Sequence, residues 1–168
     1  MTSIFIERLG AKDAEAFRAI RLEALQLHPD CFCADLDAAE AMTIAEWAQS
    51  LERTVWLGAK KDGALVAIAA FTRPASKKLA HTGELSGMYV RAGERGTGLA
   101  DGLLRAVIDH AVSEVEQVKL TVNAGNRRAI RLYERHGFRT VGCIPRRIRV
   151  GDEVYDEVIM LRRVSPSD

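Results

Sequence analysis

The chain has 168 residues, of which 48% are hydrophobic and 28% are charged. This balance is typical of one globular domain with a sizeable core, and it excludes a disordered chain, a collagen-like repeat and a disulfide-stapled miniprotein. The 24 Lys and Arg residues against 23 Asp and Glu residues leave a formal net charge of +1, so we expect neither nucleic acid nor a membrane surface as a partner.

Apolar spacing and turn residues predict the elements in the first half of the chain. In order, these are a strand at 4–6, a helix at 12–27, a helix at 43–51, and strands at 55–59 and 64–71. Pro29 ends the first helix, and Thr43 and Glu46 have the spacing of a capping box at the start of the second. The pair Asp62-Gly63 predicts a tight hairpin turn, because such turns need positive φ angles.

The second half alternates strands and helices before it closes on two strands. In order, the predicted elements are a strand at 85–90, a helix at 99–110, a strand at 118–122, a helix at 126–136, and strands at 138–148 and 154–161. Gly137 has the position of a helix C-cap. No internal repeat, low-complexity tract or linker interrupts the pattern, so the sequence predicts one mixed α/β (α+β) domain over residues 1–168.

The cysteines and the N-terminal residues indicate in which cellular compartment the protein is expected. Cys31, Cys33 and Cys143 are an odd number in a cysteine-poor chain, and the Cys-x-Cys spacing is too tight for the usual zinc site. The N-terminus has no basic stretch followed by a long apolar segment, and the longest apolar run, 64–71, is far shorter than a membrane span. We therefore expect a soluble, cytoplasmic protein without a metal.

A glycine-rich run at residues 95–100, Arg-Gly-Thr-Gly-Leu-Ala, lies where the chain leaves a strand and enters a helix. Unpaired N–H groups at such a point bind anions, and glycines let a phosphate approach the backbone, so a pyrophosphate suits the run. The dinucleotide fingerprint and the Gly-Lys-Ser/Thr ending of nucleotide-triphosphate loops are both missing. A glycine turn that only packs a helix onto a sheet stays open as the alternative.

Two ordered motifs resemble those of the GCN5-related N-acetyltransferase (GNAT) family, and with the surrounding elements the resemblance covers nearly the whole chain. Arg95, Gly98 and Ala100, after a strand that ends in Val90, match motif A, Arg/Gln-x-x-Gly-x-Gly/Ala. The residues similar to motif B are Leu120-Thr121-Val122-Asn123, Asn126, Ala129, Leu132-Tyr133-Glu134 and Gly137-Phe138. Thr97 departs from the family pattern, because a basic residue is frequent there, and the loss of that cation bears on phosphate affinity.

The resemblance implies a mixed, twisted sheet flanked by about four helices, in which the strands ending at Val90 and Asn123 splay apart to admit acetyl-CoA as co-substrate. The backbone of residues 88–90 would pair with the pantetheine amides and donate an N–H to the thioester carbonyl, where negative charge collects as an amine attacks. By the same carry-over, the cofactor-binding residues are Met88, Tyr89, Val90, Arg95, Gly96, Thr97, Gly98, Leu99, Ala100, Asn126 and Tyr133.

The resemblance also assigns the chemistry. Asn126 and Tyr133 are seven residues apart and so share one helix face, with Asn126 binding the cofactor and Tyr133 protonating the CoA thiolate. The arginines of this helix are expected to point mostly elsewhere. Glu84 is the first candidate for the general base and His81 the second, although a solvated carboxylate and a structural histidine are equally compatible with the sequence.

The sequence says less about the acceptor of the acetyl group than about the cofactor. The family's acceptor pocket corresponds to residues 31–37 and about 143–156, and the leading hypothesis is a small primary amine, such as an amino acid or its analogue, that attacks directly in a ternary complex. A protein lysine or N-terminal amine and a noncatalytic acyl-CoA-binding sensor are the alternatives, and homodimerisation is left open. The acidic residues between 30 and 52 could attract a cationic acceptor, and the arginines between 127 and 149 could hold a carboxylate or part of the cofactor. Both stretches are equally compatible with plain solvated surface.

Overall fold

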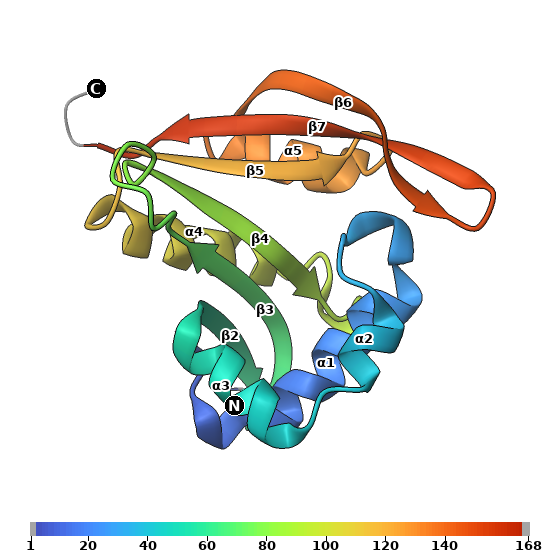
Figure 1. Cartoon of the computed structure of the whole chain (residues 1–168). Coiled ribbons are helices and arrows are strands. Elements are labelled where there is room, and N and C mark those ends of the chain that lie inside the picture. The colour runs from blue at the N-terminus through green and yellow to red at the C-terminus, as the bar shows by residue number, and fades with distance from the viewer. Residues whose placement is uncertain (1–2, 166–168) are drawn as a thin grey trace.

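The structure is a computed structural model that describes residues 3–165. Its centre is one seven-stranded sheet in the order β1-β2-β3-β4-β5-β7-β6, with helices packed on both faces (Figure 1). The strands are β1 (Ile4–Arg8), β2 (Val55–Lys61), β3 (Ala64–Thr72), β4 (Thr82–Val90), β5 (Gln117–Asn123), β6 (Arg139–Val150) and β7 (Glu153–Arg163). Neighbouring strands pair antiparallel except β4 and β5, which are parallel, so the predicted mixed sheet is confirmed.

Five α-helices accompany the sheet in the described part of the chain. They are α1 (Ala14–Leu27), α2 (Leu36–Glu40), α3 (Ile44–Arg53), α4 (Leu99–Val112) and α5 (Arg127–Arg135). The sequence predicted about four and missed α2, because this five-residue helix buries only Ala39 and shows no apolar period. The capping box of α3 is confirmed: the Thr43 hydroxyl accepts the Glu46 N–H at 3.2 Å, and the Glu46 carboxylate accepts the Thr43 N–H at 2.7 Å.

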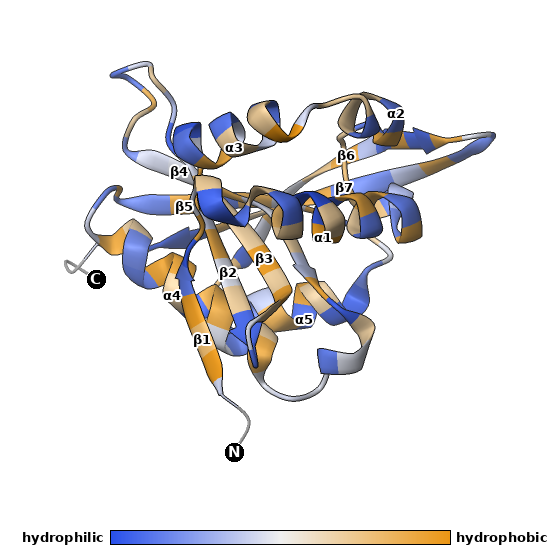
Figure 2. Ribbon diagram, turned by 90° about the horizontal axis from the view of Figure 1, so that it is seen from below, coloured by the Kyte–Doolittle hydropathy of each residue, from blue (hydrophilic) through white to orange (hydrophobic). Residues whose placement is uncertain are grey.

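Each face of the sheet has its own core. On one face, α1 and α3 pack on β2 and β3 through Phe17, Trp47 and Trp56. On the other face, α4 inserts Leu103, Leu104 and Val107, all at most 1% exposed, against β3 and β5. Figure 2 shows hydrophobic colour along β2 and β3 and helices banded in blue and orange, as expected where each helix buries one side. None of the helices in residues 3–165 is long and apolar enough to cross a bilayer.

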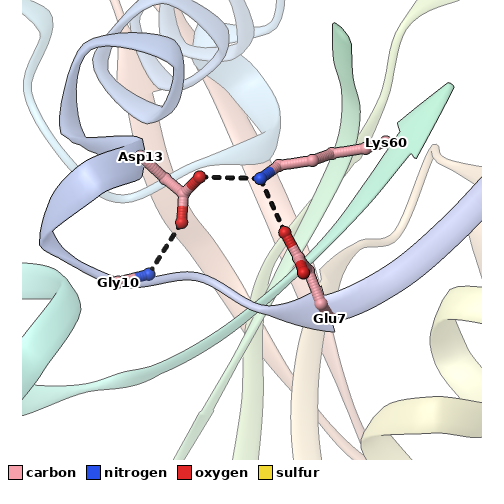
Figure 3. Close-up of polar contacts among 4 residues, drawn as sticks. All are labelled: Glu7, Gly10, Asp13 and Lys60. Atoms are coloured by element: carbon pink, nitrogen blue, oxygen red, sulfur yellow. Dashed lines mark hydrogen bonds and ion pairs between the residues drawn. The ribbon is translucent and has the colours of Figure 1, made fainter. Parts of the chain in front are cut away.

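A charged cluster joins the first strand to the start of α1 (Figure 3). The Lys60 ammonium lies 2.7 Å from an oxygen of Asp13 and 2.6 Å from an oxygen of Glu7, and the Gly10 N–H donates to the other Asp13 oxygen at 2.9 Å. Burial alone would raise the pKa of Asp13, but the Gly10 N–H and the Lys60 ammonium outweigh burial and lower it. Every charge in this cluster therefore has a partner within the chain.

The sheet opens between β4 and β5. These strands pair only at Thr82 with Gln117, Gly83 with Val118 and Glu84 with Lys119, after which β4 stays with β3 and β5 stays with β7. The divergence is visible in Figure 1 and confirms the predicted splay. It leaves facing edges of both strands without a β-sheet partner, so their N–H and C=O groups can bind an extended ligand.

A β-bulge lies in β4 beside this opening. Ile68 opposes Tyr89 and Ala70 opposes Ser86, so β4 advances three residues while β3 advances two. Gly87, within the bulge, has a φ of +60°, a conformation that glycine adopts without strain. A bulge redirects the backbone groups of its strand, which here are those of the segment predicted to face the thioester.

Candidate active site

The cleft between β4 and β5 has a volume of about 940 Å³. Residues 84–90 line it from β4, residues 120–123 from β5, and residues 30–34, between α1 and α2, from the α1 side. Its size is at the upper end of the range for small-molecule and cofactor sites. The geometry of the splay therefore provides room for a large, elongated ligand.

The glycine-rich loop forms one end of the cleft. Gly96 and Gly98 have φ angles of +78° and +84°, and a Cβ added to either would meet no atom within 4 Å. Gly98 is the N-cap of α4, so the positive end of a 14-residue helix faces this open space. The combination of left-handed backbone, helix N-terminus and free volume fits an anionic group such as a pyrophosphate.

The side chains of the loop hold it in place. The Arg95 Nε donates to the carbonyl of Val90 at 3.0 Å, and its Nη2 lies 3.2 Å from the His28 ring nitrogen. The Thr97 hydroxyl donates to the Glu94 carbonyl at 2.7 Å, and Leu99 is 6% exposed in the core around α4. All the residues predicted to bind cofactor line the cleft except Thr97 and Leu99.

Asn126 and Tyr133 line the cleft from α5. Asn126 is the N-cap of this helix: its Oδ1 accepts the Ala129 N–H at 3.2 Å, and its Nδ2 lies 3.9 Å from the Cys31 sulfur. Tyr133 is 7% exposed with its ring against Phe138, and burial, reinforced by the charge of Cys31, raises the pKa of its hydroxyl. Tyr133 is therefore protonated throughout the neutral range.

The expectation that the arginines of α5 mostly point away from the site is wrong. Arg128, Arg131 and Arg135 also line the cleft, and Arg135 is 3.1 Å from Asp101 at the start of α4. The reason is helical geometry, because residues three and four apart form one stripe beside the one that carries Tyr133. These exposed side chains form a cationic rim near the glycine-rich loop.

The two candidate bases are placed differently. Glu84 lines the cleft at the last paired position of β4 and β5, is 41% exposed in its side chain, and lies 3.3 Å from the Lys119 ammonium. His81 is exposed and does not line the cleft, and its carbonyl accepts the N–H groups of Glu116 and Gln117. Position favours Glu84 over His81.

The side chains of residues 31–33 contact three different elements. Cys31 lies beside Asn126, and the central carbon of the Arg21 guanidinium lies 5.3 Å from the Phe32 ring centre. The Cys33 sulfur lies 3.8 Å from a Glu157 oxygen. The segment is tied to β5 because the Asn123 Nδ2 donates to the Asp30 carbonyl at 2.9 Å.

The predicted acceptor segments contribute unequally. From residues 31–37, the first four line the cleft, and Asp35 and Leu36 line a neighbouring cavity of about 300 Å³. From residues 143–156, only Tyr155 lines the cleft, because the β6–β7 hairpin turns most of its length away from it. Glu157, one residue beyond the predicted segment, does line it.

Arg21, Asn123 and Glu157 line the cleft, and none of them was among the predicted site residues. Arg21 stands four residues after Phe17 and four before Leu25, both buried, so a charge inside the apolar stripe of α1 was a usable signal. Glu157 is 3% exposed and shares its strand phase with Tyr155 and Ile159. Asn123 gave no signal beyond its place in motif B, because its bond to Asp30 joins residues 93 positions apart.

No group of three or more His, Cys, Asp or Glu side chains within residues 3–165 is arranged to hold a metal ion.

Comparison with known proteins places this cleft in a family. The family model described as "Acetyltransferase (GNAT) family" matches residues 21–138. An uncharacterised N-acetyltransferase of Mycobacterium tuberculosis is 32% identical over 121 residues, which are 71% of this chain and 73% of that protein.

Solved structures of acetyltransferases share the fold of this chain. A GNAT-family acetyltransferase from Streptococcus pneumoniae has a TM-score of 0.86 at 25% identity, over 96% of this chain and 99% of that one. A protein from Salmonella typhimurium, solved with its cofactor acetyl-CoA, has a TM-score of 0.79 at 22% identity, over 96% of this chain and 94% of that one, a likeness of fold. The chain therefore belongs to the GNAT family of acetyltransferases.

Proposed function

We propose that this acyltransferase transfers the acetyl group of acetyl-CoA to the primary amine of a small molecule, by direct attack in a ternary complex. The observation that carries the proposal is the splay itself: one continuous cleft joins an anion-binding glycine loop, a β4 bulge and the Tyr133 hydroxyl. The structural neighbour from Salmonella typhimurium that holds acetyl-CoA supports this choice of co-substrate.

When bound, acetyl-CoA supplies the thioester that the amine attacks. In the proposal, the backbone N–H groups at Gly96 and Gly98 bind the pyrophosphate, and the arginines of α5 add positive charge at the rim. The free edge of β4 at residues 88–90 binds the pantetheine amides as a neighbouring strand would. A redirected N–H of the bulge then donates to the carbonyl oxygen as its negative charge grows.

In the proposal, two side chains transfer the protons of the reaction, Glu84 as the base and Tyr133 as the acid. Glu84 accepts a proton from the attacking nitrogen, directly or through a water, and its carboxylate lies 3.3 Å from the Lys119 ammonium. The Tyr133 hydroxyl, which makes no hydrogen bond to any described residue, donates to the departing sulfur. Its raised pKa makes it a persistent donor, which stabilises negative charge on sulfur by hydrogen bonding before the proton moves.

A small acceptor is favoured over a protein because the cleft is bounded on the α1 side. Phe32 is half-buried against Arg21, and the hydrogen bond from Asn123 to Asp30 fixes residues 30–34 beside β5. A peptide would need an open groove where this segment lies. A small amine needs only the room beside Phe32.

The test is the release of CoA thiol from acetyl-CoA across amino acids, polyamines, aminoglycosides and peptides, with mass spectrometry of each product. We expect acetylation of one class of small amine, with kcat/KM well above that of any peptide. Preferential acetylation of a peptide amine would replace the proposal with a protein acetyltransferase. Tight acetyl-CoA binding without turnover of any amine would favour the acyl-CoA sensor.

A further inference from the structure

Arg21 brings an uncompensated charge into the cleft. Its Nη1 atom is buried and has no hydrogen-bond partner among residues 3–165, a property shared there only with Trp47 Nε1, which does not line the cleft. Burial lowers the pKa of Arg21, and no carboxylate in the described part of the chain counters that effect. Other half-buried arginines differ, since Arg91 is paired with Glu23 at 3.0 Å.

Two aromatic rings hold the guanidinium in position. Its central carbon is 5.3 Å from the Phe32 ring centre and 5.5 Å from the Trp56 ring centre. These contacts fix the plane of the group and offset part of its lost hydration. They do not satisfy its N–H donors, and a buried unpaired cation is unfavourable by itself. The rings hold the guanidinium in one orientation, and no carboxylate of residues 3–165 pairs with it.

Its position is beside the predicted reaction centre. Nη1 lies 3.6 Å from where a Cβ on Gly87 would stand, so the guanidinium reaches the β4 bulge. Arg21 comes from α1, and the glycine-rich loop leads into α4 on the opposite face of the sheet. An anion that pairs with Arg21 would therefore enter from the α1 side, away from the start of α4.

The α1 side of the cleft also contains two carboxylates, those of Glu84 and Glu157. Glu84 is three residues before Gly87 on β4, and Glu157 is buried across the opening on β7. Within the described part of the chain, the Glu157 oxygens have two polar partners, the Cys33 sulfur at 3.8 Å and the Arg147 Nε at 3.7 Å. An acceptor that enters here meets a cation at the bulge and two carboxylates beyond it.

We propose that Arg21 binds the carboxylate of an amino-acid acceptor and sets the specificity of the enzyme for amines that carry one. The inference rests on the proposed function and narrows it from small amines to amino acids. A guanidinium binds a carboxylate through two parallel hydrogen bonds, which would complete the Arg21 donors. The α-amino group, two bonds from that carboxylate, is then held close to the bulge, with Glu84 on the same strand.

The experiment compares matched acceptors with and without the charge: an amino acid against its primary amide and against its decarboxylated amine. Hydrogen bonds to a charged group predict that the wild type prefers the carboxylate form by roughly 10- to 150-fold in kcat/KM. Arg21→Met keeps much of the apolar stem and should reduce this ratio to near one, chiefly by losing activity toward the amino acid. Arg21→Lys should retain part of the ratio.

Controls separate recognition from packing. Arg18→Met changes an arginine on the same helix that does not line the cleft, and it should leave the ratio unchanged. The KM for acetyl-CoA should be the same in all variants. If Arg21 only packs against Phe32 and Trp56, Arg21→Met will lower activity toward all three acceptors equally, and that result would overturn the inference.

A binding measurement keeps the two proposals distinguishable. Calorimetry of the CoA-bound protein with the N-acetylated amino acid and its amide reports carboxylate recognition without turnover. Equal use of charged and uncharged acceptors by the wild type would overturn the role of Arg21 and leave the acetyltransferase proposal standing. Arg21-dependent binding of the carboxylate without turnover would support carboxylate binding by Arg21 and refute the proposed acetyl transfer. If the protein showed neither carboxylate binding nor turnover, both proposals would be refuted.

Discussion

Buried charges are partnered differently in two regions of this molecule. Beside β1 and β2, Asp13 accepts the Gly10 N–H and the Lys60 ammonium, which also binds Glu7. In the cleft between β4 and β5, Arg21 has a buried nitrogen without a hydrogen-bond partner among residues 3–165, and the Glu157 oxygens have no polar partner there closer than 3.7 Å.

We interpret the difference as one between groups that stabilise the fold and groups that are available to bind a ligand. A structural cluster gains stability when every donor and acceptor is satisfied inside the chain, as at Asp13. A binding site must keep donors and acceptors for its ligand, and it accepts some loss of stability in the free protein. Changes at the first region should therefore alter stability and leave activity alone, and changes in the cleft should do the reverse.

Tyr133→Phe gives the largest expected effect. The change removes only the hydroxyl, which makes no hydrogen bond within the described residues, so melting temperature and acetyl-CoA affinity should stay close to wild type. The rate of acetyl transfer should fall by on the order of 10² to 10⁴, with the lower end expected because a thiolate leaves readily. Single-turnover kinetics measures this step, and a wild-type rate there would remove Tyr133 from the chemistry.

Cys31 tests the electrostatics of the cleft without a mutation. Burial, followed by the charge of Asp30, raises the pKa of its thiol to about 11 from an ordinary 9.0. Because the thiolate is the reactive form, alkylation near pH 8 should be about 100-fold slower than for an unperturbed thiol and should accelerate up to about pH 11. Peptide mapping after iodoacetamide should find the exposed Cys143 labelled first. Equal labelling of both residues would contradict the environment described for Cys31.

Gly98→Ala tests the phosphate end of the cleft. A side chain at a φ of +84° costs about 1–2 kcal/mol, and its Cβ enters the open volume expected to hold the pyrophosphate. We expect acetyl-CoA affinity to fall roughly tenfold or more by calorimetry. Gly93→Ala is the matched control, because Gly93 lies just before the loop, lacks a positive φ and has the same open surroundings. Equal affinities for the two variants would show that the loop does not bind phosphate.

Asp13→Asn gives the smallest expected change in activity and tests the other region. Loss of the charged hydrogen bonds to Lys60 and Gly10 should reduce the free energy of unfolding by about 2 kcal/mol and the melting temperature by about 4–8 °C. Turnover should not change. Asp109→Asn, at an exposed position of α4, is the control and should have little effect.

The pH dependence of that loss has a defined sign. The pKa of Asp13 is lowered on folding, so its contribution is complete above the unfolded value of about 3.9 and disappears as pH falls through the lower folded value. The stability difference between wild type and Asp13→Asn should therefore shrink in acid. A difference that stays constant down to pH 2 would contradict the charged pairing.

The sequence predicted what local patterns encode. Apolar periods, the Thr43 capping box and the Asp62-Gly63 turn located most of the elements, and two motifs located the loop and α5. Strand ends were predicted less well, since β4 begins three residues before the predicted position, where its parallel pairs with β5 form. Pairing partners, and not local propensity, decide where such strands begin.

The partners of the residues on the proposed acceptor side depend on long-range contacts that no local pattern reports. Arg21 meets Trp56 and the bulge at Gly87 through chain segments 35 and 66 residues away. Glu157 was missed because the expected segment ended at Asp156, and its significance comes from burial, which only the packed hairpin creates. The sequence motifs therefore locate the proposed cofactor end of the cleft, whereas the proposed acceptor residues come together only in the tertiary structure.

The central claim is direct transfer from acetyl-CoA to an amine in this cleft, and isotopic labelling tests it most directly. The enzyme is mixed with deuterated acetyl-CoA and its best amino-acid acceptor, quenched during the first turnover, and both the small molecules and the intact protein are examined by mass spectrometry. The account predicts the deuterated acetyl group on the acceptor nitrogen and none on the protein, consistent with the raised pKa of Cys31. Deuterated acetyl on Cys31 or Cys33, or no labelled product with any amine, would contradict it.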